Sequence, residues 1–294
     1  MLWEHLREEE FEDAVKRSGG VCVIPLGCIE KHGQHLPQGT DYYAVMDILE
    51  KATKIEDVVI FPTGFWFGNV SGYHASTNFV EKRCRGSIAI NLDTLTRGLE
   101  ELCDEIARNG FTKIIFHNGH GGNSIWLWHF IKRMELKKKP YATFFVRNSD
   151  QGDYPDAAEI YEAFLARRDE FPMLTDEDMK VLEEWSKKGF GGAHACFRET
   201  AHVMSKHPHL AVPERYDAES GHSIHRTELL DKLGVDIRNS WDANYPNAFD
   251  GNAPFGCSHT IGQAITQLES ERIARILTAV KNDQTYVEAA QRLS

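Results

Sequence analysis

Short apolar segments alternate with amphipathic segments along much of the chain, and this pattern predicts a sheet covered by helices. The apolar segments are rich in β-branched or aromatic residues, which is typical of strands buried on both faces. They lie at residues 21–26, 58–61, 113–116 and 142–146. We therefore predict an α/β fold whose central sheet is mostly parallel.

The amphipathic segments predict the helices between these strands. Leucine and isoleucine recur at three- and four-residue steps within residues 92–108, which should form a helix with one buried stripe. Asn91 or Asp93 could cap the start of this helix, and Gly110 fits its end. Further helices are predicted to begin near Asp41, after Asn123 and near Gly262.

The length and composition are those of a globular chain with a large core. It has 294 residues, of which 41% are hydrophobic and 26% are charged. The sequence contains no internal repeat. We expect a single domain over residues 1–294, with an irregular excursion at about 206–260, where His, Pro, Asn and Gly are frequent.

The charge and the apolar content exclude two classes of partner. A net charge of -11 argues against nucleic acid, because phosphates need clustered Lys and Arg. No segment approaches the roughly 18 apolar residues of a membrane span, and the charged N-terminus does not resemble a signal peptide. The six cysteines are dispersed, which suits reduced, buried thiols. We expect a cytoplasmic protein that binds neither nucleic acid nor membrane.

Potential metal ligands gather in the loops that follow the predicted strands. Glu30 and His32 come after the first strand, and residues two apart in an extended chain project to the same side. Asp41 begins the next helix, and His120 follows the third strand. Ligand sites in such folds lie at the carboxyl ends of the strands, so we expect these side chains to meet.

A later stretch, GGAHACFRET, adds a histidine and a carboxylate, His194 and Glu199. Mixed imidazole and carboxylate sets suit Zn²⁺, Mn²⁺ or Fe²⁺, and an aspartate can bridge two such ions. The sequence thus predicts a metal site built from several separate loops.

Each of these residues alone has a simpler explanation. A single histidine after a strand is more often a hydrogen-bonded loop residue, and a carboxylate at a helix start is usually a cap. The segment HNGHGGN at 117–123 could also cradle a phosphate, but the usual glycine-rich phosphate motifs are not present. The combination favours a metal, because carboxylates crowded in one pocket repel one another.

Three ordered segments resemble the signatures of the creatininase family. IPLGCIEKHGQHLPQGTD resembles the first signature, FHNGHGGN the second and GGAHACFRET the third, over about residues 20–205. The resemblance implies a three-layer α/β/α fold, two divalent metal ions per chain, and hydrolysis of an amide or cyclic amide. It also implies a ring-like homo-oligomer, often a hexamer.

The resemblance also implies roles for individual residues. Glu30 and His120 match the ligands of one metal, and His32 matches a ligand of the other. Asp41 matches the bridge between the two metals. His194 matches the histidine that handles protons at the reacting amide.

Two positions depart from the family pattern. Creatininase has a glutamate ligand two residues after the second-motif histidine, where this chain has Gly122. We therefore predict that Glu199 closes the second metal site, either as a direct ligand or as a neighbour of the ligands, and takes part in catalysis. Phe190 stands where creatininase has a tryptophan over the substrate, and Trp185 is nearby but out of register.

Four residues are predicted to line the substrate pocket, namely Gly121, Gly122, His74 and Phe190. The two glycines would let an amide approach the backbone closely, because no side chain blocks it. His74 lies beside an aromatic, glycine-rich loop that could equally be structural.

These expectations combine into a metal-dependent amidohydrolase. A hydroxide formed from water held between two cations would attack the C–N bond of a small cyclic amide or formamide. His194 would then protonate the leaving nitrogen. A peptidase acting on a cofactor precursor is a related possibility. The chain could instead be a non-catalytic, metal-binding scaffold subunit of a homo-oligomer, or a phosphoester hydrolase, which the negative charge disfavours.

Overall fold

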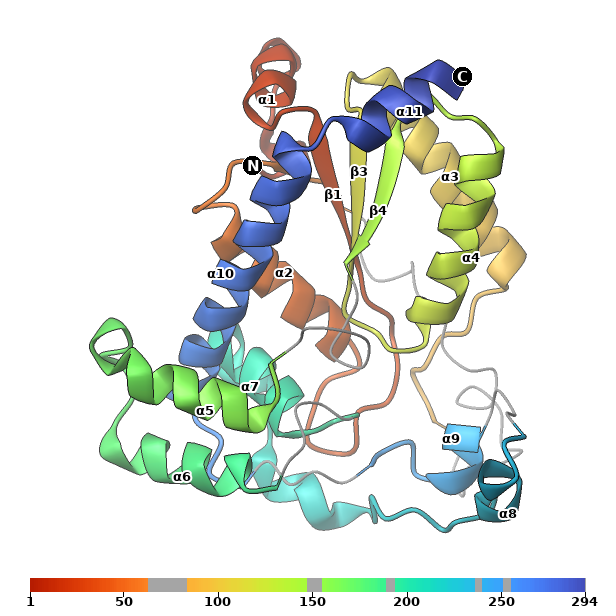
Figure 1. Ribbon diagram of the computed structural model, residues 1–294. Coiled ribbons are helices and arrows are strands. Elements are labelled where there is room, and N and C mark those ends of the chain that lie inside the picture. The colour runs from red at the N-terminus through yellow and green to blue at the C-terminus, as the bar shows by residue number, and fades with distance from the viewer. Residues whose placement is uncertain (63–83, 147–154, 189–193, 236–239, 251–254, 294) are drawn as a thin grey trace.

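The structure is a computed structural model (Figure 1), and it describes residues 1–62, 84–146, 155–188, 194–235, 240–250 and 255–293. Two of the predicted substrate-pocket residues, His74 and Phe190, lie outside the described residues. The other predicted site residues lie within them.

Four parallel strands form the sheet, as the apolar segments predicted. In chain order they are β1 (Val21–Leu26), β2 (Val59–Ile60), β3 (Lys113–Asn118) and β4 (Ala142–Val146). Their order across the sheet is β2-β1-β3-β4. The two central strands pair along their whole length, so that Leu26 lies opposite Asn118 and both strands end at the same edge.

One face of the sheet is covered by α3 (Leu92–Arg108) and α4 (Asn123–Leu136), to the right of the strands in Figure 1. Alternate residues of β1 and β3 point to this face and pack against the apolar stripes of both helices. The Asn91 side chain caps α3 by accepting a hydrogen bond from the Asp93 N–H at 2.8 Å.

The opposite face is covered by α2 (Thr40–Ala52) and α10 (His259–Asn282). Lys113 of β3 is buried here, and its Nζ donates to the carbonyls of Val280 and Lys281 at 3.0 and 2.6 Å. The last carbonyls of a helix have no N–H partner within that helix. The Lys113 ammonium donates to two such carbonyls at the end of α10, where a positive charge is favourable. Helices on both faces confirm the predicted three-layer α/β/α architecture.

A second apolar core lies beyond the sheet and is formed by α5 (Ala157–Ala166), α6 (Asp176–Ser186), α7 (Phe197–Lys206) and the first half of α10. A buried ionic network crosses from α7 to α10 beside this core. The Arg198 Nε lies 2.9 Å from one oxygen of Glu269, and the His202 Nε2 lies 3.1 Å from the other. These contacts fix the first turns of α7 against α10.

The remaining elements are short or peripheral. Helices α1 (Phe11–Arg17) and α11 (Thr285–Leu293) lie near the two termini. Within the predicted irregular excursion, the described helices are brief: α8 (Glu228–Lys232), α9 (Ser240–Asn244) and two 3-10 turns (Pro208–Leu210 and Pro213–Ala218). Further 3-10 turns lie at Trp3–His5, Glu8–Glu10 and Arg168–Glu170. Among the described helices, none is both long and apolar enough to cross a membrane.

Replacing Gly262 by alanine should destabilise the fold, because α10 and α7 approach too closely there for a side chain. A Cβ at this position would collide with the Ala201 carbonyl and lie 2.8 Å from Ser205 N. Overpacking against backbone typically costs about 1–3 kcal/mol, which outweighs a helix-propensity gain of about 1 kcal/mol.

Chemical denaturation of Gly262→Ala should therefore show a net loss of stability, of the order of 1 kcal/mol. Arg275→Ala, at an exposed position of the same helix, is the matched control and should change the free energy of unfolding by less than about 0.5 kcal/mol. A Gly262→Ala protein as stable as the parent would show that the two helices can move apart at no cost.

Candidate metal centre

The loops that follow β1 and β3 meet at the carboxyl edge of the sheet. The Gly119 N–H donates to the Leu26 carbonyl at 2.8 Å, which extends the β1–β3 pairing by one residue. The first turn of α2 lies directly over this point, because a Cβ on Gly119 would be 2.7 Å from the carbonyl oxygen of Asp41. Glycine at 119 therefore lets α2 bring Asp41 against the strand ends.

Glu30, Asp41 and His120 form the first group of potential ligands. The His120 Nδ1 lies 3.0 Å from the Glu30 Oε1 and 3.1 Å from the Asp41 Oδ2. Both carboxylates are almost completely buried, at 1% and 2% exposure. Asn118 orients the histidine loop, since its side chain accepts from the His120 N–H and donates to the His120 carbonyl.

His32, Asp41 and Glu199 form the second group. The His32 Nε2 lies 3.0 Å from the Asp41 Oδ1 and 3.7 Å from the Glu199 Oε2. The other ring nitrogen of His32 is 3.1 Å from the Glu30 carbonyl, which fixes the plane of the ring. Asp41 thus presents one carboxylate oxygen to each group.

The turn before α7 is held in an unusual conformation that delivers Glu199 and His194 to the cluster. Ala195 has a φ of 56°, in the left-handed region that non-glycine residues rarely adopt. Its N–H donates to the Glu199 Oε2 at 2.5 Å, and its carbonyl lies 2.9 Å from the His35 Nε2. Such a conformation persists only where the surroundings enforce it.

His194 lies against both ligand groups. Its Nδ1 is 3.5 Å from the Glu30 Oε1, and its Nε2 is 2.6 Å from the Lys31 carbonyl. Its ring stacks on His32 with a centroid distance of 4.2 Å. The ring of Trp241, from α9, meets His194 edge-on at 5.1 Å.

Burial and neighbouring charges shift the pKa values of His32, Asp41 and Glu199. Burial lowers the pKa of His32, but Asp41, Glu199 and Glu30 outweigh it and raise that pKa to about 10. Burial raises the pKa of Asp41, but the two histidines beside it outweigh burial, so the net shift is downward. Burial and the nearby carboxylates raise the pKa of Glu199 to about 8. The carboxylates are thus compensated by protons, which divalent cations could replace.

The donor set fits divalent metal ions. In the first group, one ligand atom each of Glu30, Asp41, His120 and the neighbouring Cys28 lie within 4.8 Å of one another. The same holds for one ligand atom each of His32, Asp41 and Glu199 in the second group. Imidazole and carboxylate ligands suit Zn²⁺, Mn²⁺ and Fe²⁺, and a shared aspartate is the usual bridge of a two-metal site. The three carboxylates repel one another in this buried space, and bound cations would offset that repulsion.

The other predicted site residues lie around this cluster or apart from it. Gly121 and Gly122 are exposed and lead from His120 into α4. Trp185 belongs to the second apolar core, where it stacks on Phe197 at 4.8 Å. It therefore does not lie over the cluster.

Two contacts that bear on the cluster join the irregular excursion at 206–260 to the site loops, and neither was predicted from the sequence. One is the ring contact of Trp241 with His194, for which no motif or spacing gives a signal. The other is an ion pair between Lys31 and Glu219, whose side chains are only 10% and 7% exposed. Lys31 stands between Glu30 and His32 in sequence, so this pair ties the excursion to the ligand loop.

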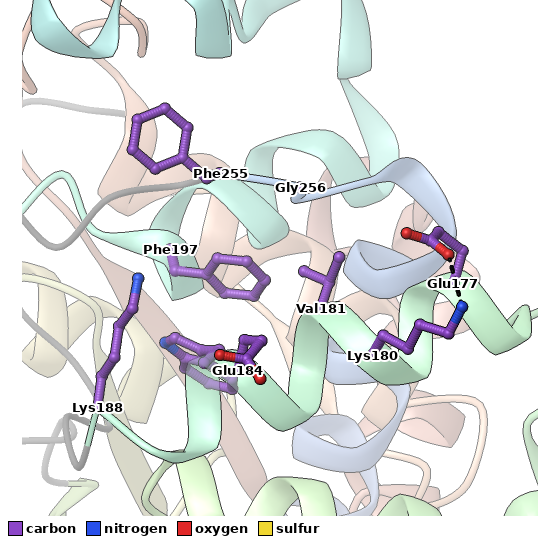
Figure 2. Close-up of a pocket in the computed structure, with 9 residues that line it drawn as sticks. Glu177, Lys180, Val181, Glu184, Lys188, Phe197, Phe255 and Gly256 are labelled. Atoms are coloured by element: carbon purple, nitrogen blue, oxygen red, sulfur yellow. Dashed lines mark hydrogen bonds and ion pairs between the residues drawn. The ribbon is translucent and has the colours of Figure 1, made fainter.

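A separate pocket of about 340 Å³ lies between α6 and residues 255–256 (Figure 2). Its apolar lining includes Phe197 and Phe255, and Figure 2 shows Glu177 and Lys180 of α6 joined by an ion pair beside it. None of the clustered ligand residues lines this pocket. We therefore place the candidate site at the strand ends.

Comparison with known proteins identifies relatives along most of the chain. Creatinine amidohydrolase from Pseudomonas putida is 24% identical over 210 residues, which cover 70% of this chain and 72% of that protein. The mycofactocin precursor peptide peptidase from Mycobacterium tuberculosis is 35% identical over 104 residues, 34% of this chain and 40% of that one.

Solved structures share the fold. A mutant creatininase superposes with a TM-score of 0.67 at 18% identity, covering 96% of this chain and 99% of the other. A putative creatinine amidohydrolase from Bacteroides fragilis gives a TM-score of 0.64 at 19% identity, covering 91% and 92%. The sequence profile of the creatininase family, described as creatinine amidohydrolase, matches residues 4–277. The chain therefore belongs to the creatininase family.

Proposed function

We propose that this protein is a metal-dependent amidohydrolase that cleaves a C–N bond of a small cyclic amide or formamide. The observation that carries the proposal is the pair of ligand groups that share Asp41, with His194 in contact with both. Membership of the creatininase family supports the same reaction class.

Glu30, Asp41 and His120 would hold one cation, and His32, Asp41 and Glu199 the other. When bound, two such cations would lower the pKa of a coordinated water and polarise the amide carbonyl. Related creatininases have been solved in forms described as Zn-Zn type and as containing Mn. Glu199 would be a direct ligand, because its carboxylate faces His32 from α7 at 3.7 Å.

His194 would donate the proton that the leaving nitrogen needs. Its side chain lies beside Glu30 of the first group and His32 of the second, and it is not among the residues that would hold a cation. The hydrogen bond from its Nε2–H to the Lys31 carbonyl leaves Nδ1, on the Glu30 side, as the nitrogen that would take up a proton and pass it to the leaving group. His194 would receive the replacement proton from solvent, since its side chain is 14% exposed.

Trp241 would form one wall for a flat substrate. Its ring is half-buried, stacks on Tyr245 at 5.4 Å and meets His194 edge-on. A rigid aromatic surface beside the proton donor suits a planar amide, because aromatic faces stack on flat groups. Gly121 and Gly122, which follow His120, would offer their backbone N–H groups to the substrate.

The relative that acts on a mycofactocin precursor peptide keeps a second substrate class open, namely a peptide amide of a cofactor precursor. The ring-like homo-oligomer and the cytoplasmic location stay predictions, the first from the family resemblance and the second from the sequence. A scaffold without activity would also hold metal, so turnover is the property that separates the two.

The test is metal content together with hydrolysis before and after chelation. We expect about two divalent ions per chain by elemental analysis, and release of product from at least one member of a panel of formamides, lactams, creatinine and short peptides. Removal of the metal should abolish that turnover, and its return should restore it. Two metals without turnover on the panel would favour the scaffold, and a protein that binds no metal would overturn the proposal.

Replacing His194 by asparagine should lower kcat by roughly 10²- to 10⁴-fold, the usual contribution of general acid catalysis. The metal content should stay at the parent value, because a proton donor is not needed to hold the ions. His129→Asn, at an exposed position of α4, is the control for both measurements. Loss of metal from the His194 variant would make this residue a ligand, which its 3.5 Å approach to Glu30 also permits.

Replacing Trp241 by alanine should raise KM for a flat substrate about tenfold, equivalent to ~1.4 kcal/mol of lost stacking, and leave the metal content unchanged. Steady-state kinetics on the best substrate of the panel would measure this effect. Trp128→Ala removes a ring that is 54% exposed on α4 and should leave KM as it is. An unchanged KM in the Trp241 variant would exclude this ring from substrate binding.

A further inference from the structure

Cys28 stands at the first ligand group rather than in an apolar core. It follows β1 directly and is 1% exposed, and its thiol donates to the Asp41 Oδ2 at 2.9 Å. Its sulfur and one ligand atom each of Glu30, Asp41 and His120 all lie within 4.8 Å of one another. Four potential ligands of three chemical types therefore converge on one buried point.

The other cysteines provide the contrast. Cys22 and Cys103 pack among aliphatic and aromatic side chains of the main core, as buried thiols usually do. Cys28 instead faces two carboxylates and an imidazole. It precedes Glu30 by two residues, as Glu30 precedes His32, and this spacing puts successive side chains on the same side of an extended chain.

The first group can take a further protein ligand, because Zn²⁺ in a catalytic site can expand to five ligands and so keep a position for water. Glu30, Asp41 and His120 supply three. Zn²⁺ accepts cysteine sulfur, histidine nitrogen and carboxylate oxygen as ligands. The Cys28 sulfur is in place to be the fourth.

We propose that Cys28 is a direct ligand of the cation held by Glu30, Asp41 and His120, and that it makes this position selective for Zn²⁺ over Mn²⁺. Soft thiolate ligands favour Zn²⁺, whereas Mn²⁺ prefers carboxylate, carbonyl and water oxygens. The thiol proton passes to solvent as the metal binds. This inference rests on the metal centre of the proposed function, but it concerns the ligand set and not the reaction.

The first experiment uses the intact protein and needs no substitution. X-ray absorption of the Zn²⁺-loaded protein should show a Zn–S path at roughly 2.3 Å. The Co²⁺-loaded protein should show a thiolate-to-cobalt charge-transfer band in the near ultraviolet. Cys28→Ser should lose both signals, whereas Cys257→Ala, a change in the second apolar core, should keep them.

The second experiment measures selectivity by competition between the two metals. The Cys28→Ser protein should bind Zn²⁺ at this position at least about 100-fold more weakly, a larger effect than the roughly 10- to 100-fold typical of residues that only orient a ligand. Its affinity for Mn²⁺ should change by less than about tenfold, so that the preference moves toward Mn²⁺.

The possible results separate this inference from the proposed function. If the parent protein holds two metals and hydrolyses an amide but shows no metal–sulfur signal, Cys28 is not a ligand and only donates a hydrogen bond to Asp41. The proposed amidohydrolase function would then stand without this inference. A protein that binds no metal overturns both, and elemental analysis detects that case before any spectrum is recorded.

Discussion

The candidate site depends on the parallel pairing of β1 with β3. Their register places Leu26 opposite Asn118, and the bond from Gly119 to Leu26 carries the pairing into the loops. Side chains alternate along a strand, so a slip of one residue would turn every buried residue of β3 to the other face. It would also move His120 away from Glu30. The sheet register therefore sets the distance between ligands that are 90 residues apart in sequence.

The second half of the cluster depends on helices rather than strands. Glu199 belongs to α7, which packs on α2 and α10 and is anchored by the buried pairing of Arg198 and His202 with Glu269. Arg198 is the direct neighbour of Glu199. Removing one partner from such a buried network usually costs more than the network contributes, because a charge is left without compensation. The position of Glu199 is thus maintained by a buried ionic network that lies outside the two ligand groups.

Much of the fold could be predicted from the sequence, because local patterns determine it. The strands at 21–26 and 142–146 and the helix at 92–108 agree with the structure. The strand in the segment 58–61 is shorter than predicted: only Val59 and Ile60 are in register with β1, although the Phe61 N–H also donates to the Val23 carbonyl. Strand β3 is longer, because its pairing with β1 continues to Asn118. Helices α5 and α6 were not predicted, although both begin with a capping box.

The candidate site could be predicted in part. Glu30, His32, Asp41, His120, His194 and Glu199 were proposed together, and the structure brings them together. Cys28 was grouped with the buried thiols, because its two-residue spacing from Glu30 is too weak a signal to separate it from the cysteines of the core. Trp241 could not be predicted, because its contact with His194 joins residues 47 positions apart through an irregular segment.

The pairing of Lys31 with Glu219 bears on how relatives of this protein could diverge. It joins the loop that carries Glu30 and His32 to the excursion that carries Trp241, and the two parts come from separate stretches of the chain. Changes within the excursion can reshape the space above the cluster and leave the strand-end loops as they are. One candidate centre could in this way serve different substrates over evolutionary time, provided that this buried ion pair is retained.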